Sequence, residues 1–176
     1  IWYVGMAIFF GIILFFLITI AIGAVTFAPW VPAYKEDISR ISDLAKLKDG
    51  DVFYDLGCGN GRVVFAVAKN CDVQAIGIEI AFPLYLFCVF RRWFFPYKHR
   101  VKYRWRNLFF IDVSSADVVY VYGLPETLSG KVAKKLRQEL RPGTCVLSYA
   151  FPIAVWKPIH VDKPQKENTA IYVYEI

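Results

Sequence analysis

One short segment, in which an acidic residue precedes three glycines, constrains the fold more than any other part of the chain. The apolar run Val52–Asp55 leads directly into Gly57, Gly59 and Gly61. Glycine allows tight turns and lets a ligand approach the backbone more closely than a side chain would permit. A strand, a glycine turn and a helix in this order predict a site for a nucleotide-like ligand at the end of the strand.

The residues around this segment alternate between strand-like and helix-like patterns. Strands are predicted at 51–55, 75–80, 101–106, 118–122, 143–150 and 170–175, and the irregular stretch 151–169 has room for one more. Helices are predicted at 36–48, 61–70, 83–95 and 126–140. Alternation of this kind predicts an α/β fold, with a mostly parallel sheet and helices on both faces.

The first part of the chain has a different character, because residues 1–34 contain no charged side chain. A helix over residues 1–28 would be about 42 Å long, whereas the hydrocarbon core of a bilayer is about 30 Å thick. We therefore predict one transmembrane helix at 1–28. Aromatic residues at both ends of the run are typical of the membrane interface. The alternative is a buried core helix, for which a domain of this size has little room.

The charges indicate how the domain is oriented. The chain has 21 Lys and Arg against 15 Asp and Glu, and every basic residue follows the apolar run. By the positive-inside rule the domain should face the cytoplasm, on a prokaryotic plasma membrane or, alternatively, at a mitochondrial inner membrane. The four cysteines show no metal-type spacing, which favours free thiols in a reducing compartment and predicts no metal site.

A second acid follows the glycine turn at the distance expected of a ribose ligand. Glu79 lies eighteen residues after Gly61, at the end of the second predicted strand, where its carboxylate can accept hydrogen bonds from ribose hydroxyls. Dinucleotide-binding enzymes use G-x-G-x-x-G, whereas this chain has D-x-G-x-G-x-G. The pattern resembles the first motif of Rossmann-like methyltransferases. That resemblance implies S-adenosyl-L-methionine as cofactor, held by Gly57, Cys58, Gly59 and Gly61, with Asp55 near its methionine portion.

Two further positions bear on the ligand and on the acceptor. Asn107 follows the third strand, where methyltransferases of this fold place a polar residue against adenine, although a plain turn asparagine is equally compatible with the sequence. Tyr122-Gly-Leu-Pro125 occupies the place where DNA amino-methyltransferases carry an Asn/Asp-Pro-Pro-aromatic motif. The absence of that motif makes nucleobase amines, and nucleic acid as a partner, a weaker hypothesis.

The order of several motifs resembles a narrower family. Pro29-Trp-Val-Pro-Ala33, the loop 55–62, Tyr122–Pro125 and Phe151-Pro152 with Trp156 fall in the same order as in the membrane-anchored protein-lysine methyltransferases of mitochondria and their prokaryotic relatives. Those enzymes modify the c subunit of ATP synthase and the adenine nucleotide translocase. The resemblance implies a seven-strand Rossmann-like methyltransferase domain at 51–176, with a connector and amphipathic helix at 29–50 that covers the site.

The same resemblance implies lysine as the acceptor, and the predicted anchor favours an acceptor protein that is itself confined to the membrane. Burial in an apolar pocket lowers the pKa of a lysine amine, which must be neutral to attack a methyl group. Tyr34, Tyr122, Phe151 and Trp156 are the predicted aromatic walls of that pocket, and core packing is the alternative role for each. The chain departs from the relatives at Tyr34-Lys35 and at Ile153–Val155, and both departures concern the acceptor side.

A basic stretch has three possible roles. Residues 91–106 contain seven Lys and Arg, two tryptophans and no acid. The alternating charges in the third strand are typical of a protected sheet edge, while anionic lipid headgroups and nucleic acid are the other two partners that such a stretch could meet. Two functional alternatives to lysine methylation also remain open at this point. They are methylation of a lipid or small membrane-soluble acceptor, and a non-catalytic cofactor-binding scaffold at the membrane.

Overall fold

A computed structural model describes residues 2–176, and seven strands form its single sheet. Their bounds are β1 Val52–Leu56, β2 Gln74–Glu79, β3 Val101–Trp105, β4 Val118–Val121, β5 Cys145–Tyr149, β6 His160–Asp162 and β7 Ile171–Glu175. The strand order is β3-β2-β1-β4-β5-β7-β6. The strands β1 to β5 are parallel, β7 is antiparallel to β5, and β6 is antiparallel to β7. The predicted α/β fold is confirmed, and β6 is the additional strand for which 151–169 had room.

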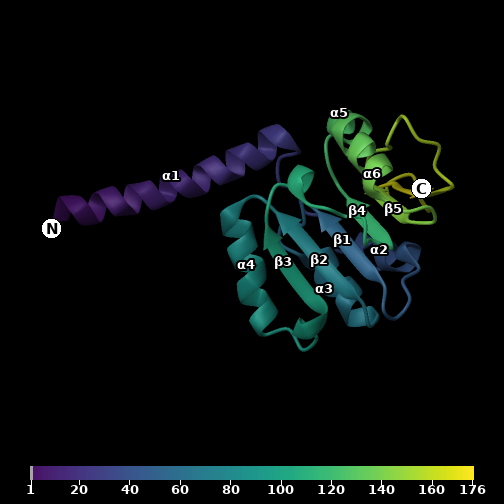
Figure 1. Ribbon diagram of the computed structural model, residues 1–176, viewed down its shortest axis with the longest axis horizontal. Coiled ribbons are helices and arrows are strands. Elements are labelled where there is room, and N and C mark those ends of the chain that lie inside the picture. Colours follow the sequence, from purple (N-terminus) through teal and green to yellow (C-terminus); the bar gives the residue numbers. More distant parts are fainter. Residues whose placement is uncertain (1) are drawn as a thin grey trace.

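Helices cover both faces of this sheet (Figure 1). They are α2 Asp37–Ala45, α3 Arg62–Asn70, α4 Phe82–Trp93, α5 Pro125–Thr127, a π-helical segment Leu128–Val132 and α6 Ala133–Glu139, with short 3-10 helices at Lys98–Arg100 and Leu108–Phe110. Successive side chains of a buried parallel strand point to opposite faces, so each strand supplies both cores. In β1, Phe53 belongs to the core under α2, α3 and α4, whereas Tyr54 and Leu56 belong to the core under the π-helical segment and α6.

Several predicted boundaries differ from the structure for local backbone reasons. The helix expected to reach residue 48 ends at Ala45, because Lys46 adopts a left-handed conformation with φ 46°. The strand expected at 143–150 is shortened at both ends, where Gly143 and Ala150 have φ values of 87° and 68°. A left-handed residue cannot continue a strand, and it is unusual for an alanine. The helix expected at 126–140 is interrupted by its π segment.

The N-terminal helix α1, Trp2–Thr26, projects away from the domain (Figure 1). Its most apolar window has a mean hydropathy of 2.9, and only 6% of that window is buried. Length and composition therefore allow α1 to cross a membrane, and its exposure does not fit the alternative of a buried core helix. Only its last turns meet the domain, and Phe27, just after the helix, is part of the core under α6.

Candidate functional site

The glycine turn lies at the edge of the sheet where the parallel strands end, which we call the carboxyl edge. Gly57, Gly59 and Gly61 all have left-handed φ values, at 84°, 55° and 71°. The backbone N–H groups of Gly57 and Cys58 donate to the carbonyl of Ile78, at 2.9 and 3.0 Å. The turn is thus fixed to the end of β2 before Gly61 opens α3.

Glu79 organises the backbone around this turn. Its Oε2 accepts from the N–H of Gly59 at 2.8 Å, and its Oε1 accepts from those of Ile80 and Ala81 at 2.9 and 2.8 Å. A carboxylate has about four acceptor positions, so about one remains for a ligand hydroxyl in this conformation. Burial raises the pKa of Glu79, and the three backbone hydrogen bonds oppose that shift.

Asp55 is buried beside the same turn. Burial, and then the charge of Glu79, raise its pKa well above the ordinary range. Asp55 lines a small cavity of about 30 Å³ together with Arg62 and Tyr120. The hydroxyl of Tyr120 is fully buried and has no hydrogen-bond partner within residues 2–176. The sequence did not single out Tyr120, because a tyrosine in an apolar strand is normally a core residue.

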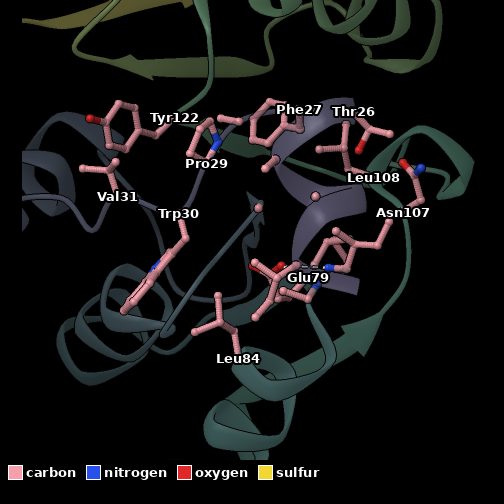
Figure 2. A pocket seen from close by; sticks show the side chains of 18 of the residues that line it. Thr26, Phe27, Pro29, Trp30, Val31, Glu79, Leu84, Asn107, Leu108 and Tyr122 are labelled. Atoms are coloured by element: carbon pink, nitrogen blue, oxygen red, sulfur yellow. Dashed lines mark hydrogen bonds between the residues drawn. The ribbon is translucent and has the colours of Figure 1, made fainter. Parts of the chain in front are cut away.

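A larger cavity, of about 80 Å³, adjoins the glycine turn, Glu79 and the end of α1 (Figure 2). Two aromatic side chains after α1 lie directly over the turn. A Cβ atom added to Gly57 would lie 2.7 Å from the ring of Phe27, and one added to Gly59 would lie 2.5 Å from the indole nitrogen of Trp30. The turn is therefore a cradle of bare backbone. Pockets for small molecules have volumes of about 300–1,000 Å³, so a nucleoside ligand enters only if these rings move aside.

The other predicted ligand residues occupy distinct places. Asn107 lines the 80 Å³ cavity, and its side-chain oxygen accepts from the N–H of Phe109 at 2.9 Å, so it caps a turn and borders the site at once. Cys58 contributes backbone to the turn, but its thiol is buried in the core, where burial and the neighbouring Cys88 raise its pKa well above the usual value.

Of the four predicted aromatic walls, Tyr34 and Tyr122 lie near each other, whereas Phe151 and Trp156 lie elsewhere. Tyr122 lines the cavity, and burial and the nearby Tyr34 hydroxyl raise its pKa. The Tyr34 ring is 65% exposed. Phe151 is half-exposed after β5, and Trp156 packs against Tyr174 with 5.6 Å between ring centroids. Neither Phe151 nor Trp156 borders the cavity that Tyr122 lines.

Polar contacts that the sequence did not reveal hold the connector over the carboxyl edge. Arg62 donates to the carbonyl of Ala33 at 2.7 Å, and the Tyr149 hydroxyl donates to Asp37 at 2.6 Å. Arg40 joins Asp37 to Asp162 near β6. Tyr149 and Asp37 are more than a hundred residues apart in the chain, so no local pattern could have indicated their contact.

Residues 55–160, which include the glycine turn, Glu79 and Tyr122, match the family model described as the ANTKMT methyltransferase domain. The chain belongs to this methyltransferase family. A protein-lysine N-methyltransferase from Saccharolobus islandicus is 33% identical over 84% of the chain and 93% of its own length. A lysine N-methyltransferase from Xenopus laevis, named for the c subunit of ATP synthase, is 29% identical over 76% of the chain, which spans 58% of that relative.

A solved structure supports the cofactor. The structure described as an RNA methyltransferase from Salinibacter ruber in complex with S-adenosyl-L-homocysteine is 33% identical, with a TM-score of 0.78 over 83% of this chain and 94% of the other. The chain is thus an S-adenosylmethionine-dependent methyltransferase, as the resemblance of its glycine motif implied. The buried acids, which can accept hydrogen bonds from ligand hydroxyl and amino groups, and the bare backbone of the glycine turn fit this cofactor.

Proposed function

We propose that this methyltransferase methylates a lysine side chain of a membrane protein, with α1 in the bilayer and the domain on the cytoplasmic side. Its curated relatives are named for lysine methylation in proteins, among them enzymes named for the c subunit of ATP synthase and for the adenine nucleotide translocase. The excess of basic residues after α1 supports the orientation.

The observation that carries the proposal is the composition of the cavity wall. Ile20, Gly23 and Ala24 of α1 line the same cavity as Gly57 and Glu79. A helix that crosses the bilayer therefore ends in the wall of the cofactor cavity. An acceptor lysine must approach within a few ångströms of that wall, so a protein held at the same membrane surface gains a high effective concentration.

The residues of the chain divide the work in this proposal. The backbone of the glycine turn and Glu79 bind the ribose side of the cofactor, Asp55 binds near its methionine portion, and Asn107 borders its base. The cofactor supplies a methyl group on a positively charged sulfur. Tyr122 with the apolar wall around it excludes water from the lysine amine, which favours the neutral form that can attack. Trp30 and Phe27 close the cavity when no cofactor holds them apart.

The experiment measures methyl transfer to material solubilised from native membranes. The full chain, purified in lipid nanodiscs, is incubated with solubilised membrane proteins and cofactor carrying a tritiated methyl group. We expect label in methyl-lysine after acid hydrolysis, and about a hundredfold less with Glu79→Gln, because the site loses a charge that binds cofactor. Glu126→Gln, an exposed acid on α5, is the matched control and should label normally.

The distribution of label decides between acceptors. If all of the label extracts into organic solvent, the acceptor is a lipid and not a lysine. Label removed by ribonuclease would favour RNA, a second candidate supported by the description of the Salinibacter ruber structure. No label in any fraction, together with intact cofactor binding, would leave only the non-catalytic scaffold.

A further inference from the structure

Helix α4 carries a continuous aromatic face that no part of the described chain covers. Its members are spaced so that they share one side of the helix, and both Trp93 and Phe94 are more than 60% exposed. We call this set the α4 apolar face: Leu86, Phe87, Phe90, Trp93 and Phe94. Its rings are mutually packed, with Phe90 and Phe94 centroids 5.2 Å apart. The opposite side of α4 carries Cys88, which is fully buried against the sheet.

A strong positive charge surrounds this face. From residue 80 to residue 111 there are seven Lys and Arg and no acid, and removing these seven from the total leaves fourteen basic residues against fifteen acidic ones. The excess charge of the protein therefore lies in this segment. Lys98, Lys102, Arg104 and Arg106 are exposed, and none of them forms an ion pair with another residue between 2 and 176. We call these four the basic edge, since β3 is the last strand on this side of the sheet.

The position of α4 relative to α1 indicates what covers the face. Helix α4 runs crosswise to α1, on the side of the domain from which α1 projects (Figure 1). The two helices meet where Phe82 packs against Phe15, with ring centroids 5.3 Å apart, and where the N–H of Phe82 donates to the Thr19 hydroxyl at 3.2 Å. A bilayer whose normal follows α1 would therefore have α4 lying along its surface.

With α1 in the bilayer as proposed, the exposure of its side chains sets the level that lipid must reach. Ile20 and Ile22 lie beyond the contact, on its domain side, and both are more than 40% exposed. Water would meet these side chains unless lipid covers them, and lipid that reaches them also reaches the level of Phe82 and the start of α4. Trp105, which lies between Arg104 and Arg106 of the basic edge, also packs against Phe82, with 4.7 Å between the ring centroids.

We propose that the α4 apolar face and the basic edge together form a second membrane contact, which docks the catalytic domain onto an anionic bilayer. The aromatic rings enter the boundary between headgroups and acyl chains, and the basic side chains meet lipid phosphates, as in interfacial amphipathic helices. This contact fixes the tilt of the carboxyl edge over the membrane. It rests on the proposed anchoring by α1, and it does not depend on which acceptor is methylated.

The test uses the full chain in nanodiscs that contain lipids brominated near the top of the acyl chain, with and without anionic phosphatidylglycerol. Tryptophan fluorescence is measured, and the component of each tryptophan is the difference in fluorescence between the parent and the variant in which that residue is Phe. We expect the Trp93 component to be quenched by about half or more in anionic discs, as for an interfacial ring. Trp156→Phe, which reports a ring packed against β7, is the matched control and should show almost no quenching.

The outcomes separate this inference from the anchor itself. Quenching of the Trp2 component with none for Trp93 would overturn α4 docking and leave α1 in the membrane. Quenching of neither would contradict the anchoring in the proposed function as well. The triple variant Lys98→Gln, Lys102→Gln, Arg104→Gln should lower Trp93 quenching in anionic discs and not in neutral ones. A Trp93 component that responds to added structured RNA and ignores lipid would assign the surface to nucleic acid and overturn the proposal.

Discussion

The two halves of the carboxyl edge are built differently. At the ends of β1 and β2, Asp55 and Glu79 are buried, and Glu79 is bonded to the backbone of the glycine turn. At the ends of β4 and β5, the aromatic side chains are partly exposed, and they come from positions as distant as Tyr34 and Phe151. In the cofactor half, Glu79 and the glycine turn are already held in place by local hydrogen bonds. The exposed, scattered aromatic side chains of the proposed acceptor half do not define a specificity from the chain alone.

The largest expected effect is a loss of cofactor affinity that occurs on substitution in the cofactor half and not in the acceptor half. Glu79→Gln should weaken binding of S-adenosylhomocysteine by about a hundredfold, because it removes a charge and turns one acceptor into a donor facing an N–H group. Tyr122→Phe, in the acceptor half, should change the same affinity less than about threefold. Isothermal titration measures both. Equal losses for the two variants would show that the halves do not divide the ligands in this way.

Packing around the glycine turn should give the largest loss of stability. At Gly61 a Cβ atom would lie 2.3 Å from the Tyr103 hydroxyl, in a left-handed conformation. Gly143 is also left-handed but has open space around it. We expect Gly61→Ala to lower the free energy of unfolding by about 2–4 kcal/mol and Gly143→Ala by about 1–2 kcal/mol. Chemical denaturation measures the free energy of unfolding of both variants. Equal losses would contradict the packing argument.

We expect Asp55 to lower the stability of the cofactor-free protein and to strengthen cofactor binding. Its pKa is raised by burial and by Glu79, so the ionised carboxylate destabilises the folded state at pH above its ordinary range. Asp55→Asn should therefore stabilise the cofactor-free protein by about 1 kcal/mol at neutral pH while weakening cofactor binding. Because the folded pKa is raised, the destabilisation disappears as the pH falls toward the unfolded value. Thermal unfolding across pH should show the advantage of the variant shrinking in acid; a constant or growing advantage would be inconsistent with this assignment.

The acceptor half should give the smallest effects, and these should appear mainly in turnover. Tyr122→Ala removes part of the cavity wall, so we expect about a tenfold loss of kcat/KM for the protein acceptor with little change in cofactor affinity. Trp156→Ala is the matched comparison, because this ring lies outside the cavity. Steady-state assays with labelled cofactor distinguish the two. A larger loss for Trp156→Ala would place the acceptor on the β7 side of the edge.

The extent to which the sequence predicted the molecule follows the same division. The glycine turn, the positions of both acids beside it and the mostly parallel sheet were predicted from residues close in sequence and from regular alternation, and the family resemblance implied the seven strands. The resemblance implied that the connector at 29–50 covers the site, but the contacts of Trp30 and Phe27 with the glycine turn, and the contact between Tyr149 and Asp37, were not predicted. They arise from packing between segments that are distant in the chain, where the sequence pattern shows a tyrosine or tryptophan only as an apolar residue.

The most direct test of lysine methylation is mass spectrometry of membrane proteins from cells with this gene, without it, and with the Glu79→Gln variant in its place. We predict at least one lysine in a membrane protein that is methylated only in the parent cells. Restoration of that methyl group by Glu126→Gln would show that the loss belongs to the site. Identical lysine methylation in all of these cells would contradict the account.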